Sequence, residues 1–134
     1  MITFKYKSIK PFYLTDNELN QLVVLHQKQL DLPAEIIKNQ LVNRDLVHLY
    51  YDENQLELIG TIGTQEIHLH DGIVMYYGNT VIDEQFKHST CLAHAIQKSM
   101  ASLFLRHPFK KKYHAALASS SGSFLYFSKF KPSW

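Results

Sequence analysis

The sequence predicts a single α+β domain over residues 1–134, built on a mixed sheet with the element order β-α-α-β-β-β-α-β-α. Three β-favouring segments, 46–51, 56–67 and 73–82, follow one another with turns between them, which predicts an antiparallel meander. A helical period at 90–105 then leads to a short strand at 113–118. A strand, a helix and a strand in one sheet require a right-handed crossover, so the last two strands are parallel.

The first elements are a strand and two helices. Residues 2–7 alternate apolar and polar side chains, as a half-buried strand does. Thr15 and Glu18 have the spacing of a capping box, and apolar residues at helical spacing follow, which predicts a helix over 16–30. Pro33 suits the first turn of a second helix, whose buried face is expected to hold Ile36, Ile37, Gln40 and Leu41.

Turn residues separate the strands of the meander. Residues 52–54 form the first turn, and Asp71-Gly72 the second. Asp-Gly is typical of tight hairpin turns that need a positive φ, so we expect Gly72 to adopt one. Beyond the strand at 113–118, the aromatic segment 123–130 predicts a short final helix.

Composition and charge narrow the function. The chain is 46% hydrophobic and 13% aromatic, which is a globular composition. The net charge is only +2, which argues against nucleic-acid binding. Arg106 and the lysines at 110–112 form a short basic run, which we expect to be a solvated connection between helix and strand.

The cysteine count and the N-terminus bear on location. Cys91 is the single cysteine, so no intramolecular disulfide can form, in agreement with a reducing cytoplasm. The N-terminus has no long apolar stretch of the kind found in signal peptides. No run approaches the ~20 apolar residues that cross a bilayer, so we expect a cytoplasmic protein without a membrane partner.

The segment 79–92 carries the strongest motif. It reads NTVIDEQFKHSTCL, a β-strand that runs through an aromatic-basic pair into the start of a helix. Backbone N–H groups in such a loop, together with the positive end of the helix dipole, form a phosphate site. In this order of elements and in this motif, the chain resembles the GNAT N-acetyltransferases, which have the acyl-CoA N-acyltransferase fold.

The resemblance implies an acetyl-CoA site. Val81, Asp83, Phe86 and Lys87 match the family pattern, whereas the family's small-residue positions hold His88, Thr90 and Leu92 and contain no glycine. By resemblance, the pantetheine pairs with the strand 79–82 and the phosphates lie on the loop 85–91. The residues then expected to contact coenzyme A are Thr80, Val81, Ile82, Lys87, His88, Ser89, Thr90, Cys91 and Ser119.

A second resemblance covers Ser119 to Phe130. Ser119, Gly122 and Tyr126 fall on the family's N-x-x-[A/S] and tyrosine spacing, with Ser119 in place of the asparagine. By resemblance, Tyr126 is the general acid that protonates the leaving thiolate, a transfer that a phenol can perform. The alternative is that Tyr126 belongs to an aromatic core cluster.

The general base is the least defined part of the expected site. The resemblance asks for a carboxylate or a water chain near the middle strands, so Glu66 and His68 are candidates. Histidine has the ordinary pKa closer to neutrality. Strand alternation also places Glu66, His68 and His70 on one face, which is the solvated face in the alternative interpretation.

Other chemistries lack a pattern in this sequence. There is no H-E-x-x-H and no spaced set of cysteines, and His68-x-His70 alone is a weak ligand pair, so no metal is expected. No G-x-S-x-G elbow is present. Cys91 at a helix start would be stabilised as a thiolate, but has no evident partner base, and a packed thiol is the expectation.

The sequence therefore predicts an acetyl-CoA-dependent N-acetyltransferase that acts on an unidentified amine by direct attack on the thioester. The alternative is a domain of the same fold that only binds or dimerises. A weaker third possibility is an acyl donor on a carrier protein or an aminoacyl group, met by the basic run at 106–112. The closing strands expected of the family are missing after residue 130. Three explanations are open: a truncated chain, a minimal variant, or a sheet edge completed by a partner chain. We expect a homodimer or a missing C-terminal portion.

Overall fold

A computed structural model describes residues 4–54, 57–86 and 90–116. Five strands form one sheet in the order β1-β2-β3-β4-β5. All neighbours are antiparallel except β4 and β5, which are parallel and joined through a helix. The predicted α+β class is confirmed. The strands are Phe4–Ile9, Leu46–Asp52, Leu58–His68, Gly72–Ile82 and Lys111–Ala116.

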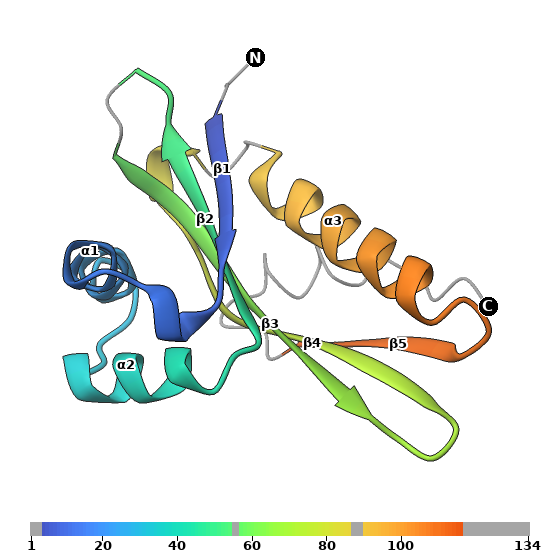
Figure 1. Ribbon diagram of the computed structural model, residues 1–134. Coiled ribbons are helices and arrows are strands. Elements are labelled where there is room, and N and C mark those ends of the chain that lie inside the picture. Colours follow the sequence, from blue (N-terminus) through green and yellow to red (C-terminus); the bar gives the residue numbers. More distant parts are fainter. Residues whose placement is uncertain (1–3, 55–56, 87–89, 117–134) are drawn as a thin grey trace.

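Two helices cover one face of this sheet. α1 spans Asp16–Gln27 and α2 spans Ala34–Val42, and both lie on the opposite side of the sheet from α3 (Figure 1). The predicted capping box is formed, because Glu18 N donates to Thr15 Oγ1 and Thr15 N donates to Glu18 Oε1. Their apolar residues pack with those of the sheet in one core, which comprises Leu22, Val23, Leu25, Ile37, Leu41, Val47, Leu49, Leu58 and Val81.

One helix covers the other face. α3 spans Cys91–Arg106 and connects the parallel strands β4 and β5 across the sheet (Figure 1). Its apolar stripe forms a second core with the facing residues of β2, β3 and β4. That core comprises Tyr50, Ile59, Ile62, Ile73, Met75, Tyr77, Cys91, Ala95, Ile96 and Leu103. Short 3-10 turns, Pro11–Tyr13 and Glu84–Phe86, follow β1 and β4. No helix in the described ranges has the length and hydropathy that a bilayer crossing requires.

Three local expectations were wrong. In α2, Ile37 and Leu41 are buried as predicted, but Ile36 is 43% exposed. Gly72 has no positive φ; it begins β4, and a Cβ there would lie 2.7 Å from the Lys111 carbonyl oxygen, so the close approach of β5 explains the glycine. Lys112 is not solvated: it is 2% exposed within β5, and its ammonium donates to the Lys110 carbonyl above the Phe104 ring.

A β-bulge interrupts β4. Thr61 is opposite Val81 and Gly63 is opposite Gly78, so β4 has one residue more than β3 across this interval. Asn79 lies in it with φ of 51°, the single positive φ outside glycine among the described residues. Tyr77 belongs to the α3 core and Val81 to the α1–α2 core, although residues four apart in a regular strand share a face. The bulge therefore reverses the faces of β4.

Two histidines are buried on opposite sides of the sheet. His26 in α1 donates from Nδ1 to the Leu22 carbonyl, at 2.7 Å. His48 in β2 lies between the hydroxyls of Tyr6, at 2.8 Å, and Thr64, at 3.2 Å. Burial lowers the pKa of His26, and burial with the charge of His94 lowers the pKa of His48 to about 4. Both imidazoles are therefore neutral near pH 7.

We predict that Asn79→Ala destabilises the protein more than Asn79→Gly. Both changes remove the hydrogen bonds of the amide, at a cost of about 2 kcal/mol. Alanine also keeps a Cβ in the left-handed region, which adds about 1 kcal/mol that glycine avoids. Urea unfolding of the two variants measures the difference. Equal stability, or a less stable glycine variant, would contradict the backbone argument.

We also predict that His48 makes the stability of the folded protein depend on pH. Its pKa is lower in the folded chain than the 6.5 of the unfolded one, so the unfolded state binds more protons between these values. Stability is complete above pH 6.5 and declines as pH falls toward 4, by up to about 3 kcal/mol. His48→Gln, which cannot titrate, should flatten this decline in urea unfolding from pH 7 to pH 4. Parallel curves for the two proteins would contradict it.

Candidate functional site

The expected donor residues lie where β4 leads into α3. Thr80, Val81 and Ile82 are the last residues of β4, after the bulge. Thr90 is the N-cap residue of α3 and Cys91 its first helical residue. Lys87, His88 and Ser89 lie outside the described residues. The structure therefore confirms a strand, a short turn and a helix start in this order, which is the local arrangement that the motif predicted.

The edge of β4 that faces β5 is paired along only part of its length. Pairing with β5 runs from Gly72–Lys111 to Tyr77–Ala116. Within the described ranges, residues 78–82 of β4 have no partner strand on this side. Backbone groups on a strand edge without a partner strand are ready to pair with an extended ligand. The bulge at Asn79 lies where this pairing stops.

Thr80 carries an unsatisfied polar atom at this edge. Its Oγ1 is buried and has no hydrogen-bond partner among the described residues. Such a group costs free energy unless a partner is supplied. By contrast, Val81 packs in the α1–α2 core and Ile82 against the α3 core, so both can contact a ligand mainly through their backbone.

The start of α3 is also suited to a ligand. Thr90 is exposed, and its side chain makes no capping hydrogen bond. No acidic residue stands in the first turn, so the positive end of the helix dipole is not compensated there by a carboxylate of the helix itself. The Cys91 thiol is buried within the α3 core, as the expectation of a packed thiol requires.

The amide of Asn79 connects the bulge to α1, to α2 and to Arg44, which follows α2. Its Nδ2 donates to Gln40 Oε1 of α2 at 3.1 Å and lies 3.2 Å from His26 Nε2 of α1. Its Oδ1 accepts from Arg44 Nε at 2.9 Å. Because the Nδ1 hydrogen of His26 is directed at the Leu22 carbonyl, Nε2 is the nitrogen that accepts. These contacts place a polar cluster on the α1–α2 face beside the bulge.

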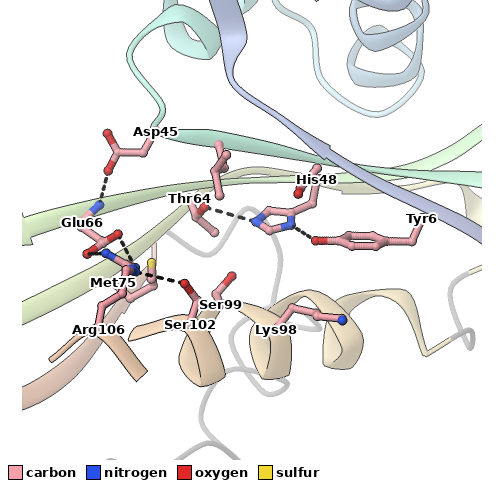
Figure 2. Close-up of a pocket in the computed structure, with 12 residues that line it drawn as sticks. Tyr6, Asp45, His48, Thr64, Glu66, Met75, Lys98, Ser99, Ser102 and Arg106 are labelled. Carbon is pink, nitrogen blue, oxygen red and sulfur yellow. Dashed lines mark hydrogen bonds and ion pairs between the residues drawn. The ribbon is translucent and has the colours of Figure 1, made fainter. Parts of the chain in front are cut away.

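A cavity of about 300 Å³ lies on the opposite face, between the sheet and α3 (Figure 2). The hydroxyl of Tyr6, the imidazole of His48 and Thr64 line it from the sheet. Ser99 and Lys98 line it from α3, and the Ser99 hydroxyl is buried with no partner among the described residues. Glu66, one of the expected bases, is also part of this wall.

Glu66 is held by a bidentate ion pair. Arg106 of α3 donates to its two carboxylate oxygens, at 2.9 Å and 2.7 Å, and Glu66 N donates to Asp45 Oδ2 (Figure 2). The hydrogen bonds from Arg106 to Glu66, together with the negative charge of that carboxylate, raise the pKa of the guanidinium. Both carboxylate oxygens of Glu66 are therefore already engaged by the guanidinium.

His68 lies beside Glu66 on the same face, as strand alternation predicted. Its Nε2 is 3.9 Å from Glu66 Oε1, and its ring contacts that of His107 edge to face. The ligand atoms of Glu66, His68 and His107 all lie within 4.8 Å of one another. Two imidazoles and a carboxylate are ligands of transition metals, but Arg106 already occupies both oxygens of Glu66.

Sequence reasoning missed several of these neighbours. His107 and Arg106 are about 40 residues from Glu66 along the chain, so no local spacing announces their contact. Asn79 is the first residue of the motif segment 79–92, and its position after Gly78 inside a strand is a sequence signal for a β-bulge. Ser119 and Tyr126, the other expected site residues, lie outside the described residues.

Comparison with known proteins gives likeness of structure only. No family model matches the chain, and no curated protein matches it in sequence. Many solved structures do match. A ribosomal-protein-alanine N-acetyltransferase from Brucella melitensis superposes with a TM-score of 0.67 at 8% identity, over 98% of this chain and 95% of that one.

Two further structures were solved with a ligand. A predicted acetyltransferase with acetyl-CoA, from Clostridium acetobutylicum, has a TM-score of 0.64 at 13% identity, over 98% of this chain and 92% of that one. An aminoglycoside acetyltransferase in complex with sisomicin, from an uncultured soil metagenomic sample, has a TM-score of 0.62 at 14% identity, over 96% and 88%. The chain thus has the fold of the GNAT acetyltransferases, which its strand-to-helix motif also resembles.

Proposed function

We propose that this protein is an N-acyltransferase that uses acetyl-CoA and transfers the acetyl group to an amine. The observation that carries the proposal is the edge of β4 at 78–82, which has no partner strand among the described residues and precedes α3 in the chain. A strand edge and a helix N-terminus in succession match the two chemical parts of coenzyme A, an amide-containing arm and a pyrophosphate.

The residues of this segment would hold the donor in a simple order. Backbone groups of Thr80, Val81 and Ile82 would pair with the amides of pantetheine, and the Ile82 carbonyl, which accepts from Gln29 Nε2, would share or exchange that partner. Thr90 and Cys91, with Lys87, His88 and Ser89 before them, would present N–H groups to the pyrophosphate. Ser119 would contact the same arm from the C-terminal segment.

The residues present fit such a donor. Thr80 Oγ1 is a buried hydroxyl that lacks a partner among the described residues, and an amide of the donor would supply one. Thr90 is exposed, so its side chain leaves the backbone of the helix start accessible despite the absence of glycine. No carboxylate in the first turn of α3 would repel the phosphates.

The donor supplies a thioester carbonyl, which an uncharged amine attacks directly. The chain must then take a proton from the attacking nitrogen and give one to the departing thiolate. We assign the second role to Tyr126 and the first to Glu66 or His68, which are 3.9 Å apart. His68 is the more accessible of the two, with a side chain 53% exposed, and Glu66 must loosen its pair with Arg106 to act.

A second candidate function is binding without catalysis by a domain of the same fold, with a homodimer as one form. The ion pair of Glu66 with Arg106 favours it, because both carboxylate oxygens are already engaged. We place the protein in the cytoplasm under either proposal, since its single cysteine is buried and needs no oxidising compartment.

We predict that the purified protein binds acetyl-CoA and that Thr90→Glu weakens this binding about tenfold or more, a loss of about 1.4 kcal/mol. A carboxylate at the helix N-cap would repel the pyrophosphate. Calorimetric titration measures both proteins. Gln97→Glu is the matched control, since it adds the same charge on an exposed position of α3 and should bind as the wild type does.

Turnover separates the two candidate functions in the same preparation. With acetyl-CoA bound, a screen of amines should release free thiol, and Tyr126→Phe should lower the rate without changing donor affinity. Donor binding without turnover on any amine would favour the domain that only binds. The absence of binding at millimolar acetyl-CoA would overturn the acyltransferase proposal itself.

A further inference from the structure

We propose that Arg44 binds an anionic group of the acceptor, and that the acceptor is therefore an amine that also carries a carboxylate, such as an amino acid. This inference rests on the proposed acyltransferase function and specifies its substrate class. Three observations support it: the contacts that orient the guanidinium of Arg44, the lack of a described carboxylate beside it, and its position near the edge of β4.

The side chain of Arg44 lies in a trough on the α1–α2 face. Arg44 follows α2, and its N–H donates to the Leu41 carbonyl at 3.1 Å. The trough is formed by two glycines opposite each other on β3 and β4, Gly63 and Gly78. A Cβ on Gly63 would lie 2.9 Å from Arg44 Cγ, and one on Gly78 would collide with the guanidinium. The pair of glycines therefore makes room for this arginine.

In the part of the chain that the structure describes, the groups that orient the guanidinium are neutral. Nε donates to Asn79 Oδ1 at 2.9 Å, and Nη1 donates to Gln65 Oε1 at 3.3 Å. The guanidinium carbon is 5.1 Å from the centre of the Tyr76 ring, a cation–π contact. The half-buried side chain is thus held in one position before any ligand arrives, which lowers the entropic cost of binding.

The charge of Arg44 is not matched by a carboxylate. No Asp or Glu oxygen of residues 4–54, 57–86 or 90–116 comes within 4.0 Å of its guanidinium. Arg106, the other arginine, shows the contrast, because Glu66 takes its charge through two hydrogen bonds. A guanidinium has five N–H donors in a planar fork that suits a carboxylate, and two groups of the described residues accept from Arg44. The remaining donors are available to an anion.

Arg44 also lies where an acceptor must come. Its partner Asn79 is the bulge residue at which β4 loses β5, so the guanidinium lies within one side chain of the proposed donor edge. On the opposite face of β4, Tyr77 is 1% exposed in the apolar α3 core, and the polar cavity of that face lies beside His48 and Glu66 instead. A carboxylate on Arg44 would fix the acceptor beside the thioester and direct its amine along β4. Glu66 and His68 lie on the other face of the sheet, so a water chain would carry the amine proton to them.

The alternative is that Arg44 only fills the trough and covers apolar surface with its stem. The two roles predict different ligand preferences. A structural arginine has no effect on whether an amine carries a carboxylate, whereas an anion site discriminates between such amines. The experiment therefore uses probes that differ in the carboxylate and in nothing else.

We would titrate lysine against cadaverine and γ-aminobutyrate against propylamine, using the full chain saturated with free coenzyme A. Calorimetry of this dead-end complex needs no turnover. We expect the carboxylate member of at least one pair to bind tenfold or more tightly than its partner. Arg44→Gln should remove this preference, Arg44→Lys should retain part of it, and donor affinity should stay unchanged in both.

Lys10→Gln is the matched control, since it removes one positive charge from an exposed position and should keep the preference. Circular dichroism and thermal unfolding verify that each variant is folded. If coenzyme A binds but the wild type does not discriminate within either pair, or if Arg44→Gln keeps the preference, the Arg44 inference is overturned and the acyltransferase proposal stands. If coenzyme A does not bind, both fall together.

Discussion

The left-handed backbone of one residue, Asn79, is the constraint on which the rest of this structure depends. It adds a residue to β4, so that Tyr77 packs under α3 while Val81 packs under α1 and α2. The strain is offset by an amide that bonds to His26, Gln40 and Arg44. The Asn79 side chain therefore links the bulge to both α1 and α2, and these hydrogen bonds fix the position of β4 at the candidate site.

The same bulge divides β4 into a structural half and a half available to a ligand. Before it, β4 has strands on both sides and closes the sheet with β5. After it, residues 78–82 keep β3 on one side and have no described partner strand on the other. A short turn, Glu84–Phe86, follows β4, and α3 begins at Cys91. Asn79 thus contributes both to the stability of the fold and to the proposed donor site, as is common for residues with strained backbone.

Local patterns predicted most of the fold, and contacts between distant segments account for what they missed. The strand periods, the capping box at Thr15 and the helix before β5 follow from spacing alone. The conformation of Gly72 and the burial of Lys112 did not follow from spacing. Gly72 is explained by the approach of β5, about 40 residues away in the chain, and Lys112 by the Phe104 ring of α3. In the site, the motif located the strand and the helix start. It could not reveal that Arg106 holds Glu66 or that no described carboxylate pairs with Arg44, since both facts depend on packing.

The most direct test of this account is amide hydrogen exchange of β4 with and without acetyl-CoA. The amides of residues 78–82 that point away from β3 should exchange quickly in the free protein, and a donor arm paired with them should slow that exchange. Residues 72–77, already paired with β5, serve as the internal reference. We expect acetyl-CoA to protect 78–82 and leave 72–77 unchanged. Exchange at 78–82 that is slow in the free protein, or is unaffected by saturating acetyl-CoA, would contradict the central claim that this edge receives the donor.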